Sequence, residues 1–460
     1  MSTFAITNPA TDATIDTVTD HDATQAALMV DRAQAAFEQW RRTTPRERSE
    51  VLMAAHRGML EQSEHLADLM VAENGKSRSD AAAEVTYAAE FFRWYAEEAV
   101  RPSGSFGPAP TGPVRNIVTH HPVGVSVLIT PWNFPAAMAT RKIGPALAAG
   151  CSVLLKPAQE TPLTALAVAD ILTQAGLPQD VLQIATTTDA GTVVSAWLAD
   201  DRVRKLSFTG STGVGRLLLE QCAGRVVNTS MELGGNAPFI VTADADIDQA
   251  VAGAMVAKFR NTGQACTAAN RFYVHADVVD AFTDAFGAKI EELTVGDAAD
   301  GNQIGPVITA KAAAKITDRV DEAVAAGARV THRATVPAGA NAAFVAPQLL
   351  RDVPHDSALV REEIFGPIAP VVTWTDEDEM VRWANDTDMG LAAYVYAGEL
   401  QHALQLAERL EAGMVGINRG IVSDPSAPFG GVKQSGIGRE GGHFGMEEFT
   451  EAQYLSLAWD

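Results

Sequence analysis

Two hydrophobic periodicities, one of helices and one of strands, alternate along the chain from about residue 116 onward. After strand-like runs at 116–119 and 123–130, helical spacing and short apolar runs follow one another without a long interruption. The predicted helices of this first set are 136–149, 162–175, 191–199 and 213–221, and the strands are 152–155, 181–184, 203–208 and 226–230. Such alternation is typical of βαβ units and predicts an α/β fold with a mostly parallel sheet.

A second alternating set predicts a second α/β unit. Its helices are expected at 247–258, 278–293, 309–326, 377–385 and 400–410, and its strands at 271–274, 370–374, 391–396 and 414–417. The first hundred residues predict short strands within 5–18 and then three helices. The second of these helices begins with a capping-box pair, Thr44 and Glu47, around Pro45. The third, 80–100, carries an aromatic stripe that we interpret as core packing.

Two segments lie outside this alternation. Residues 101–113 are rich in proline and glycine and predict a linker or excursion. Residues 450–457 form a single strand-like run at the C-terminal end. A strand must pair along its edge, and another subunit is one possible partner.

The net charge of the chain limits the kinds of partner that it can bind. The 460 residues carry a formal net charge of −22, which argues against nucleic acid and against anionic membrane surfaces as partners. An anionic substrate would be repelled by the overall field, so local arginines would have to attract it.

No apolar run approaches the ~18 residues of a membrane span, and no signal peptide is visible. Three scattered cysteines predict a reducing, cytoplasmic setting.

One of those cysteines, Cys266, stands in a polar loop between small residues. A thiol in such a loop can be reached by a substrate. Because the thiolate is the nucleophile, catalysis would need surroundings that lower the thiol pKa, together with a base for later steps. The alternative is a small buried hydrophobic residue.

Other candidate groups follow predicted strands. The turn at 209–215 carries Gly210, Ser211 and Gly215 before a helix, which favours an anion such as phosphate. Its G-x-x-G-x-G spacing differs from the usual dinucleotide fingerprint, G-x-G-x-x-G. A tight turn that binds no ligand is an alternative interpretation of the same residues. A literal G-x-G-x-x-G at 436–441 follows no convincing strand, and we reject it as a nucleotide site.

Three further side chains are suited to chemistry. Lys156 ends a strand where ligands of open sheets bind. Glu232 stands beside apolar residues and glycines, where partial burial would raise its pKa toward that of a general base. Asn133, between two prolines, offers an amide N–H to an oxyanion. The alternative for Lys156 and for Glu232 is an ordinary surface residue. The ten histidines form no metal motif, and we predict no metal site.

Together these segments resemble the aldehyde dehydrogenase family along essentially the whole chain. The matching motifs, in the family's order, are 131–135, 156–158, 208–215, 232–235, 263–266, 362–367 and 428–431. The resemblance implies a Rossmann-like dinucleotide-binding domain (1–101 and 122–232) and an α/β catalytic domain (233–427). It also implies a small β oligomerisation element (102–121 and 428–460) in a homodimer or homotetramer.

The resemblance also implies a mechanism. Cys266 would attack the aldehyde carbonyl, Asn133 and the Cys266 N–H would hold the oxyanion, and Glu232 would activate the water that hydrolyses the thioester. The cofactor, NADP or NAD, would be bound by a set of residues along the nucleotide cleft. These are Trp132, Lys156, Gln159, Gly210, Ser211, Gly215, Glu363 and Phe365. At position 159, NAD-preferring relatives carry Glu, which repels a 2′-phosphate; Gln159 therefore favours NADP.

Within the family, the chain looks most like succinate-semialdehyde dehydrogenases. The substrate carboxylate would then be held by Arg141, Arg260 and Ser423, unless the arginines serve structural ion pairs. Alternatives are an enzyme for another short acid-aldehyde such as glutarate semialdehyde, a CoA-acylating enzyme, and a catalytically silent relative. The presence of Glu232 argues against the second, and intact Cys266, Glu232 and Asn133 argue against the third. Ala268 replaces the second cysteine of some relatives, so we predict no redox switch.

Overall fold

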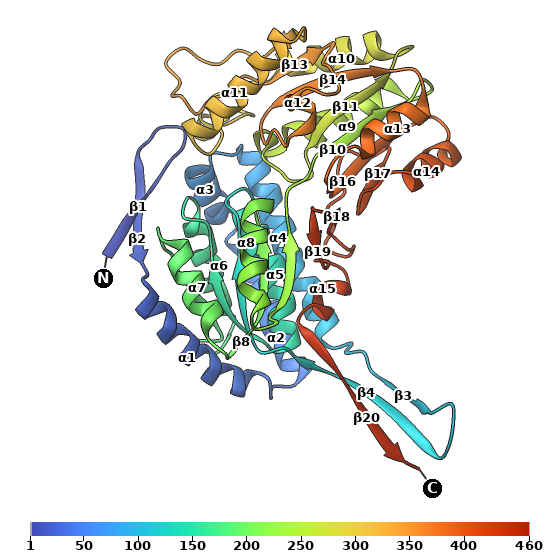
Figure 1. Cartoon of the computed structure of the whole chain (residues 1–460). Coiled ribbons are helices and arrows are strands. Elements are labelled where there is room, and N and C mark those ends of the chain that lie inside the picture. Colours follow the sequence, from blue (N-terminus) through green and yellow to red (C-terminus); the bar gives the residue numbers. More distant parts are fainter. Residues whose placement is uncertain (1, 460) are drawn as a thin grey trace.

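The computed structural model describes residues 2–459, which form two stacked α/β bodies and a projecting arm (Figure 1). The first body is built on a six-stranded sheet in the order β19-β9-β8-β5-β6-β7. All its strands are parallel except β19, which runs antiparallel to β9. The strands are β5 (Val125–Ile129), β6 (Ser152–Lys156), β7 (Leu182–Ile184), β8 (Val203–Thr209), β9 (Asn228–Glu232) and β19 (Gly436–Ile437).

Helices cover both faces of this sheet. One face packs on α1 (Ala23–Trp40), α7 (Ala190–Ala199) and α8 (Thr212–Ala223). The other packs on α5 (Pro135–Ala149), α6 (Pro162–Gln174) and the helices around them. Those outer helices are α2 (Pro45–Glu61), α3 (Ser63–Asn74) and α4 (Arg78–Ala99). The capping box predicted at Thr44 and Glu47 is present at the start of α2.

The second body is a seven-stranded sheet in the order β12-β13-β14-β11-β10-β16-β17. Helices α9 and α10 pack on one face, and α11, α13 and α14 on the other. The strands are β10 (Ala237–Val241), β11 (Ala269–His275), β12 (Arg329–Arg333), β13 (Gln348–Arg351), β14 (Ile368–Trp374), β16 (Ala392–Tyr396) and β17 (Met414–Ile417). The helices are α9 (Ile247–Phe259), α10 (Val279–Glu291), α11 (Ala310–Ala325), α12 (Ala358–Arg361), α13 (Glu377–Asn385) and α14 (Leu400–Glu408).

The remaining elements are short. A hairpin of β1 (Ser2–Thr7) and β2 (Thr14–Asp20) opens the chain, and β15 (Met389–Gly390) pairs with β18 (Val432–Lys433). The 3₁₀ helices are η1 (Arg260–Gly263) and η2 (Ala298–Asp300), and α15 (Phe444–Glu447) precedes the last strand. No helix within 2–459 is long and apolar enough to cross a lipid bilayer.

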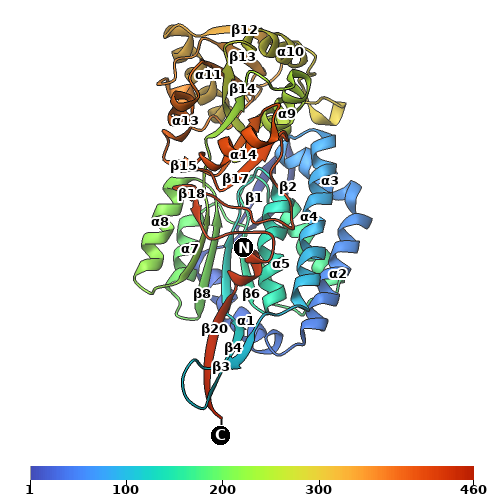
Figure 2. The ribbon, with the colours of Figure 1, turned by 90° about the vertical axis from the view of Figure 1, so that its right-hand side faces the viewer.

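The arm is a three-stranded antiparallel sheet of β3 (Ser105–Pro108), β4 (Val114–Pro122) and β20 (Thr450–Ala458). It extends away from both bodies and carries the C-terminus at its tip (Figures 1 and 2). The proline- and glycine-rich excursion contains strand β3, which was not predicted. The strand expected at the C-terminal end is present, and its partner, left open by the sequence, is β4 of its own chain, from Thr450 opposite Pro122 to Ala458 opposite Val114.

The predicted alternation matches the two sheets, with four strands missed: β10, β12, β13 and the two-residue edge strand β19. β10 was hidden because it is short, follows a glycine turn and has Pro238 as its second residue. β12 is a polar, half-exposed edge strand with no alternating pattern, and β13 has only four residues. The strand expected at 226–230 begins and ends two residues later, at Asn228 and Glu232. The segment 436–441 contains edge strand β19 and no strand–turn–helix unit.

Candidate active site

A cavity of about 730 Å³ opens at the carboxyl ends of β5, β6 and β8, and residues of the second body close it. Nine of the predicted site residues line it: Trp132, Asn133, Lys156, Gln159, Gly210, Ser211, Cys266, Glu363 and Phe365. Five do not line it: Glu232, Gly215, Arg141, Arg260 and Ser423. The cavity therefore gathers seven of the eight residues predicted for the cofactor, all but Gly215, and Cys266 and Asn133 are on its wall.

One end of the cavity is built by the turn after β8. Ser211 is the N-cap of α8 and its side chain accepts a hydrogen bond from Val214 N at 3.4 Å. The helix N-terminus and its free amide groups favour an anion at this point. A Cβ at Gly210 would lie 2.5 Å from the Phe208 ring, so only glycine fits beside it. Lys156, at the end of β6, adds an ammonium group to the wall.

Gly215 serves packing. A Cβ there would lie 2.5 Å from Leu233 Cδ2, so the absence of a side chain lets α8 approach the segment that follows β9. The sequence placed Gly215 among the cofactor-binding residues, whereas the structure places it behind the cavity wall. Its neighbours Gly210 and Ser211 form the wall itself.

The second body supplies Glu363 and Phe365. Gly235 N donates to Glu363 Oε1 at 3.1 Å, and burial raises the pKa of this carboxyl to about 7. The Phe365 ring meets the Trp132 ring edge to face, with 5.5 Å between centroids. This contact joins the two bodies across the cavity. A carboxylate, an ammonium, a helix N-terminus and two aromatic rings are groups that fit the riboses, pyrophosphate and nicotinamide of a dinucleotide.

The loop that carries Cys266 is bent by an unusual run of backbone angles. Asn261, Thr262 and Gly263 all have positive φ, at 51°, 58° and 76°. Left-handed backbone at two residues other than glycine indicates a loop held in place by its surroundings. On the other side, a Cβ at Gly235 would lie 2.2 Å from Cys266 O, so glycine is needed for the two loops to meet.

The Cys266 thiol is protonated in these surroundings. Burial raises its pKa to about 12, the positive charges of Arg141 and Arg260 oppose the rise, and Glu363 and Glu232 add to it. The unliganded protein therefore does not provide the lowered thiol pKa that catalysis at Cys266 would need. Desolvation outweighs the two arginines because the thiol lies against apolar residues of the second core.

The Asn133 amide has a fixed orientation. Its Oδ1 accepts from Phe134 N at 3.1 Å, and its Nδ2 donates to Gln264 O at 3.0 Å. An amide nitrogen carries two hydrogens, so one N–H of Asn133 remains available to a substrate oxygen. Since Gln264 is two residues before Cys266, this hydrogen bond also ties the amide to the loop of the thiol.

Glu232 ends β9 and is 2% exposed. Neither of its carboxylate oxygens has a hydrogen-bond partner in the described part of the chain. Burial, and then the negative charge of Glu440, raise its pKa well above the ordinary value, while Arg141, Lys142 and Arg439 act in the opposite direction. A buried carboxyl without hydrogen bonds, close enough to affect the Cys266 thiol, has the properties of a general base.

Arg141 is engaged by a carboxylate of its own chain. It forms a buried ion pair with Glu440, and its guanidinium carbon lies 4.0 Å from the centroid of the Phe429 ring. Lys142 also pairs with Glu440 and donates to Ser207 Oγ at 2.8 Å. The structural ion pair that was the alternative reading of Arg141 is thus present. Its charge nevertheless acts on the Cys266 thiol.

Arg260, unlike Arg141, forms no ion pair with a carboxylate in the described part of the chain. Its guanidinium carbon lies 5.0 Å from the centroid of the Phe134 ring, and no carboxylate within residues 2–459 pairs with it. Ser423 is half-buried and lies next to the hydroxyl of Tyr87, which is also next to Arg141. The buried Tyr87 hydroxyl makes no hydrogen bond of normal geometry to any described residue.

Tyr87 was missed from the sequence because α4 was read only as an aromatic core helix. Phe91, Phe92 and Tyr95 are indeed buried there. A usable signal existed in the spacing of Glu84, Tyr87 and Phe91, which puts a charge and a hydroxyl on the same helix face as a core phenylalanine. Glu440 was missed as well, because it stood inside the rejected glycine motif.

Comparison with known proteins agrees with this geometry. The family model described as "Aldehyde dehydrogenase family" matches residues 1–455. A succinate-semialdehyde dehydrogenase of Paenarthrobacter nicotinovorans is 48% identical over 97% of this chain and 98% of its own length. A glutarate-semialdehyde dehydrogenase of Pseudomonas putida is 46% identical over 99% of this chain and 94% of its own.

Solved structures agree as well. The crystal structure of an NADP-dependent enzyme of E. coli superposes with a TM-score of 0.97 at 45% identity, covering 99% of this chain and 95% of that one. A match along the whole chain, in sequence and in fold, confirms the resemblance stated above. The chain belongs to the aldehyde dehydrogenase family.

Proposed function

We propose that this protein oxidises succinate semialdehyde to succinate with NADP or NAD, and that NADP is preferred. The observation that carries this proposal is electrostatic. In a chain of net charge −22, Arg141 and Arg260 both act on the Cys266 thiol, and neither lines the cofactor cavity. Positive charge near the nucleophile but outside the cofactor cavity suits an aldehyde that ends in a carboxylate.

The proposed chemistry uses the groups described above. The Cys266 sulfur would bond to the aldehyde carbon and its proton would pass to solvent, while the Asn133 amide and the Cys266 N–H would stabilise the oxyanion that forms from the carbonyl. A bound nicotinamide cofactor would supply the hydride acceptor, and Cys266 would then carry the oxidised substrate as a thioester. Glu232 takes a proton from water, whose oxygen bonds to the acyl carbon; the C–S bond breaks and the acid departs.

The carboxylate end of the substrate would be held by Arg260, Arg141 and Ser423, and we add Tyr87 to this group. Tyr87 offers a buried hydroxyl beside both Arg141 and Ser423, and among residues 2–459 this hydroxyl makes no hydrogen bond of normal geometry. A carboxylate that accepted from it would remove an unsatisfied polar atom from the protein. Arg260 supplies the main charge, because Arg141 already shares Glu440.

A second substrate is supported by the relatives. The glutarate-semialdehyde dehydrogenase of Pseudomonas putida is nearly as similar as the succinate-semialdehyde enzyme. One additional methylene changes the selectivity of a pocket by only about 10–200-fold. Values of kcat/KM for acid-aldehydes of increasing chain length decide between the two.

The cofactor preference rests on Gln159. This side chain lies on the cavity wall and carries no charge to repel a 2′-phosphate. The E. coli structure that superposes on this chain is described as NADP dependent, which supports the same choice. The ratio of kcat/KM for NADP and NAD in the parent and in Gln159→Glu tests it; we expect NADP use to fall in the variant.

We also propose the division into domains given by the resemblance, a cytoplasmic location, and assembly through the arm into a dimer or tetramer. The arm exposes large apolar side chains, including Phe106, Tyr454 and Leu455, and β20 keeps one unpaired edge. Removing residues 450–460 should yield a smaller species in light scattering. A truncated chain with the parent's mass would contradict this part of the proposal.

Initial rates test the substrate directly. The parent and Arg260→Ala are compared on succinate semialdehyde and on propanal, with the exposed Arg93→Ala on α4 as the matched control. We expect kcat/KM for succinate semialdehyde to fall about 100-fold in Arg260→Ala, as for a lost charged hydrogen bond, with little change for propanal. A parent that prefers propanal would keep the family and overturn the substrate.

A further inference from the structure

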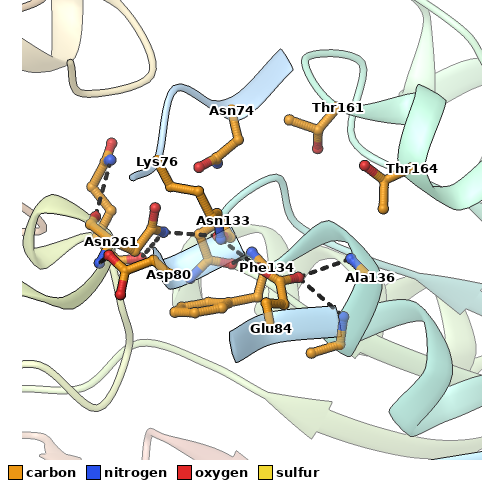
Figure 3. A network of polar contacts seen from close by, with 12 residues as sticks. Asn74, Lys76, Asp80, Glu84, Asn133, Phe134, Ala136, Thr161, Thr164 and Asn261 are labelled. Atoms are coloured by element: carbon orange, nitrogen blue, oxygen red, sulfur yellow. Dashed lines mark hydrogen bonds and ion pairs between the residues drawn. The ribbon is translucent and has the colours of Figure 1, made fainter. Parts of the chain in front are cut away.

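Behind Asn133 lies a buried polar network that includes two groups with no role in the proposed chemistry. They are Lys76, in the short connection between α3 and α4, and Glu84, on α4, which are 1% and 3% exposed. Figure 3 shows them on the side of Asn133 that faces α4. Neither lines the cavity.

Lys76 connects three parts of the site. Its ammonium forms an ion pair with Glu84 and donates to Asn133 O at 2.8 Å. It also lies 4.2 Å from the centroid of the Phe134 ring, the ring that Arg260 contacts. Asn261 Nδ2 donates to the same Asn133 O at 2.7 Å, so both lone pairs of this carbonyl are used.

Glu84 holds the other end of the same turn. Its Oε1 accepts from Ala136 N at 2.9 Å and from Ala137 N at 3.1 Å, in the first turn of α5. The pair therefore contacts the backbone at Asn133 and again three residues later. A residue fixed on both sides has little freedom to rotate its amide.

The same helix also holds the loop of the nucleophile. Asp80, one turn before Glu84 on α4, accepts from Asn261 N at 2.9 Å. Asn261 Nδ2 in turn donates to Gln264 O at 3.2 Å, the carbonyl to which Asn133 Nδ2 also donates. Helix α4 thus sets the position of Asn133 relative to the Cys266 loop (Figure 3).

Helix capping alone does not explain a lysine here. Glu73 caps α6 in the same manner, accepting from Leu163 N at 2.8 Å and Thr164 N at 2.9 Å, with no lysine beside it in the described structure. Burying an ion pair also stabilises a fold little compared with apolar packing. What Lys76 adds is its bond to Asn133 O.

We propose that Lys76 and Glu84 are positioning residues that hold the Asn133 amide at the distance from Cys266 that the oxyanion requires. This inference rests on the proposed role of Asn133 in catalysis. A shift of about 1 Å in such a group can lower the rate about 100-fold. The pair would therefore affect kcat although it lies outside the cavity.

A double-mutant cycle tests the inference, with kcat measured on propanal and on succinate semialdehyde so that the substrate class does not decide the result. We expect Asn133→Ala to lower kcat by about 10²–10³-fold, as for removal of an oxyanion donor. Glu84→Gln should lower it by about 10–100-fold. The combined variant should be within about 3-fold of Asn133→Ala alone, because the pair acts through that amide.

The matched control is Glu73→Gln, which removes an equally buried helix-capping carboxylate and should lower the melting temperature while leaving kcat unchanged. Lys76→Met/Glu84→Gln removes both charges together, leaves no single buried charge, and replaces any single variant that fails to fold. Multiplicative losses in the cycle would overturn the inference and leave the role of Asn133 intact. An unchanged kcat in Asn133→Ala would overturn both.

Discussion

Two buried lysine–glutamate pairs lie close to the proposed catalytic residues, and they are built differently. The pair of Lys76 and Glu84 has a hydrogen-bond partner for every charged group: Asn133 O for the ammonium and two backbone amides for the carboxylate. The pair of Lys142 and Glu440 is shared with Arg141 and lies near Glu232, whose oxygens have no partner among the described residues.

This difference in hydrogen bonding suits the two pairs to two different roles, one in geometry and one in protonation. A fully bonded pair fixes geometry, because moving any member breaks several hydrogen bonds at once. An incompletely bonded cluster sets protonation, because the charge of Glu440 raises the pKa of Glu232 while Arg141 and Lys142 lower it. We therefore propose that the first pair governs where the substrate oxygen is held and that the second governs when Glu232 can accept a proton.

The largest effect is expected from Glu232→Gln. The amide cannot take a proton from water, so kcat should fall by about 10²–10⁴-fold, with KM changed much less. Glu98→Gln, a buried carboxyl paired with Arg101, is the control and should retain the parent kcat. A Glu232→Gln enzyme with parent kcat would show that the unpartnered carboxyl is not the base.

The pH dependence of Glu440→Gln tests whether Glu440 sets the protonation of Glu232. The base works as a carboxylate, so kcat rises as pH increases through the pKa of Glu232. Without Glu440, Arg141 and Lys142 are no longer neutralised; the pKa of Glu232 falls, and the acidic limb of the kcat profile moves to lower pH. The same change should lower the free energy of unfolding by about 3–5 kcal/mol. A limb at the parent's pH would contradict the comparison.

A third buried lysine, Lys258, differs from the lysines of both pairs because no carboxylate is bonded to it in the described structure. Burial lowers the pKa of its ammonium to about 7, so the folded state disfavours its charged form. The resulting destabilisation is complete below pH 7 and disappears as pH rises toward 10.5, the ordinary value. Lys258→Met should therefore raise the free energy of unfolding by about 1–4 kcal/mol at pH 6 and by less at pH 9. Chemical denaturation at both pH values measures this, and a destabilised variant would contradict it.

The smallest effect is expected from Tyr87→Phe. Loss of one hydroxyl from the carboxylate site should lower kcat/KM for succinate semialdehyde by about 10-fold, as for one hydrogen bond. Propanal, which has no carboxylate, serves as the control substrate and should be oxidised at the parent rate. An equal loss on both substrates would show that Tyr87 supports the fold and not the substrate.

The residues that the sequence predicted share one property: each belongs to a short local motif. Cys266 and Asn133 stand in loops where residue type suggests a function, and Glu363 belongs to a motif of the family that the chain resembles. Lys76, Tyr87 and Glu440 could not be found in this way. They reach the site only because α4 and the segment after β19 pack on α5, and contacts between distant segments leave no periodic signal.

The fold, like the site, could be predicted from the sequence only where the signal is local. Alternating helices and strands predicted both α/β bodies, because hydrophobic periodicity is local. The partner of the terminal strand was left open, because pairing of β20 with β4 joins residues more than 300 apart in sequence. The raised pKa of the Cys266 thiol could not be predicted from the sequence for a related reason. The thiol pKa depends on burial in the assembled core, which the polar loop around Cys266 does not reveal by itself.

The most direct test of the division of tasks is a stopped-flow record of reduced cofactor formed in the first turnover. It is made for the parent, Glu84→Gln and Glu232→Gln under saturating substrate and cofactor. Glu232→Gln should give a burst of about one equivalent per active site at near the parent rate and then a slow steady state. Glu84→Gln should form reduced cofactor slowly from the start, with no burst. If both variants slowed the same phase, the two buried pairs would not have separate roles, and the account would be contradicted.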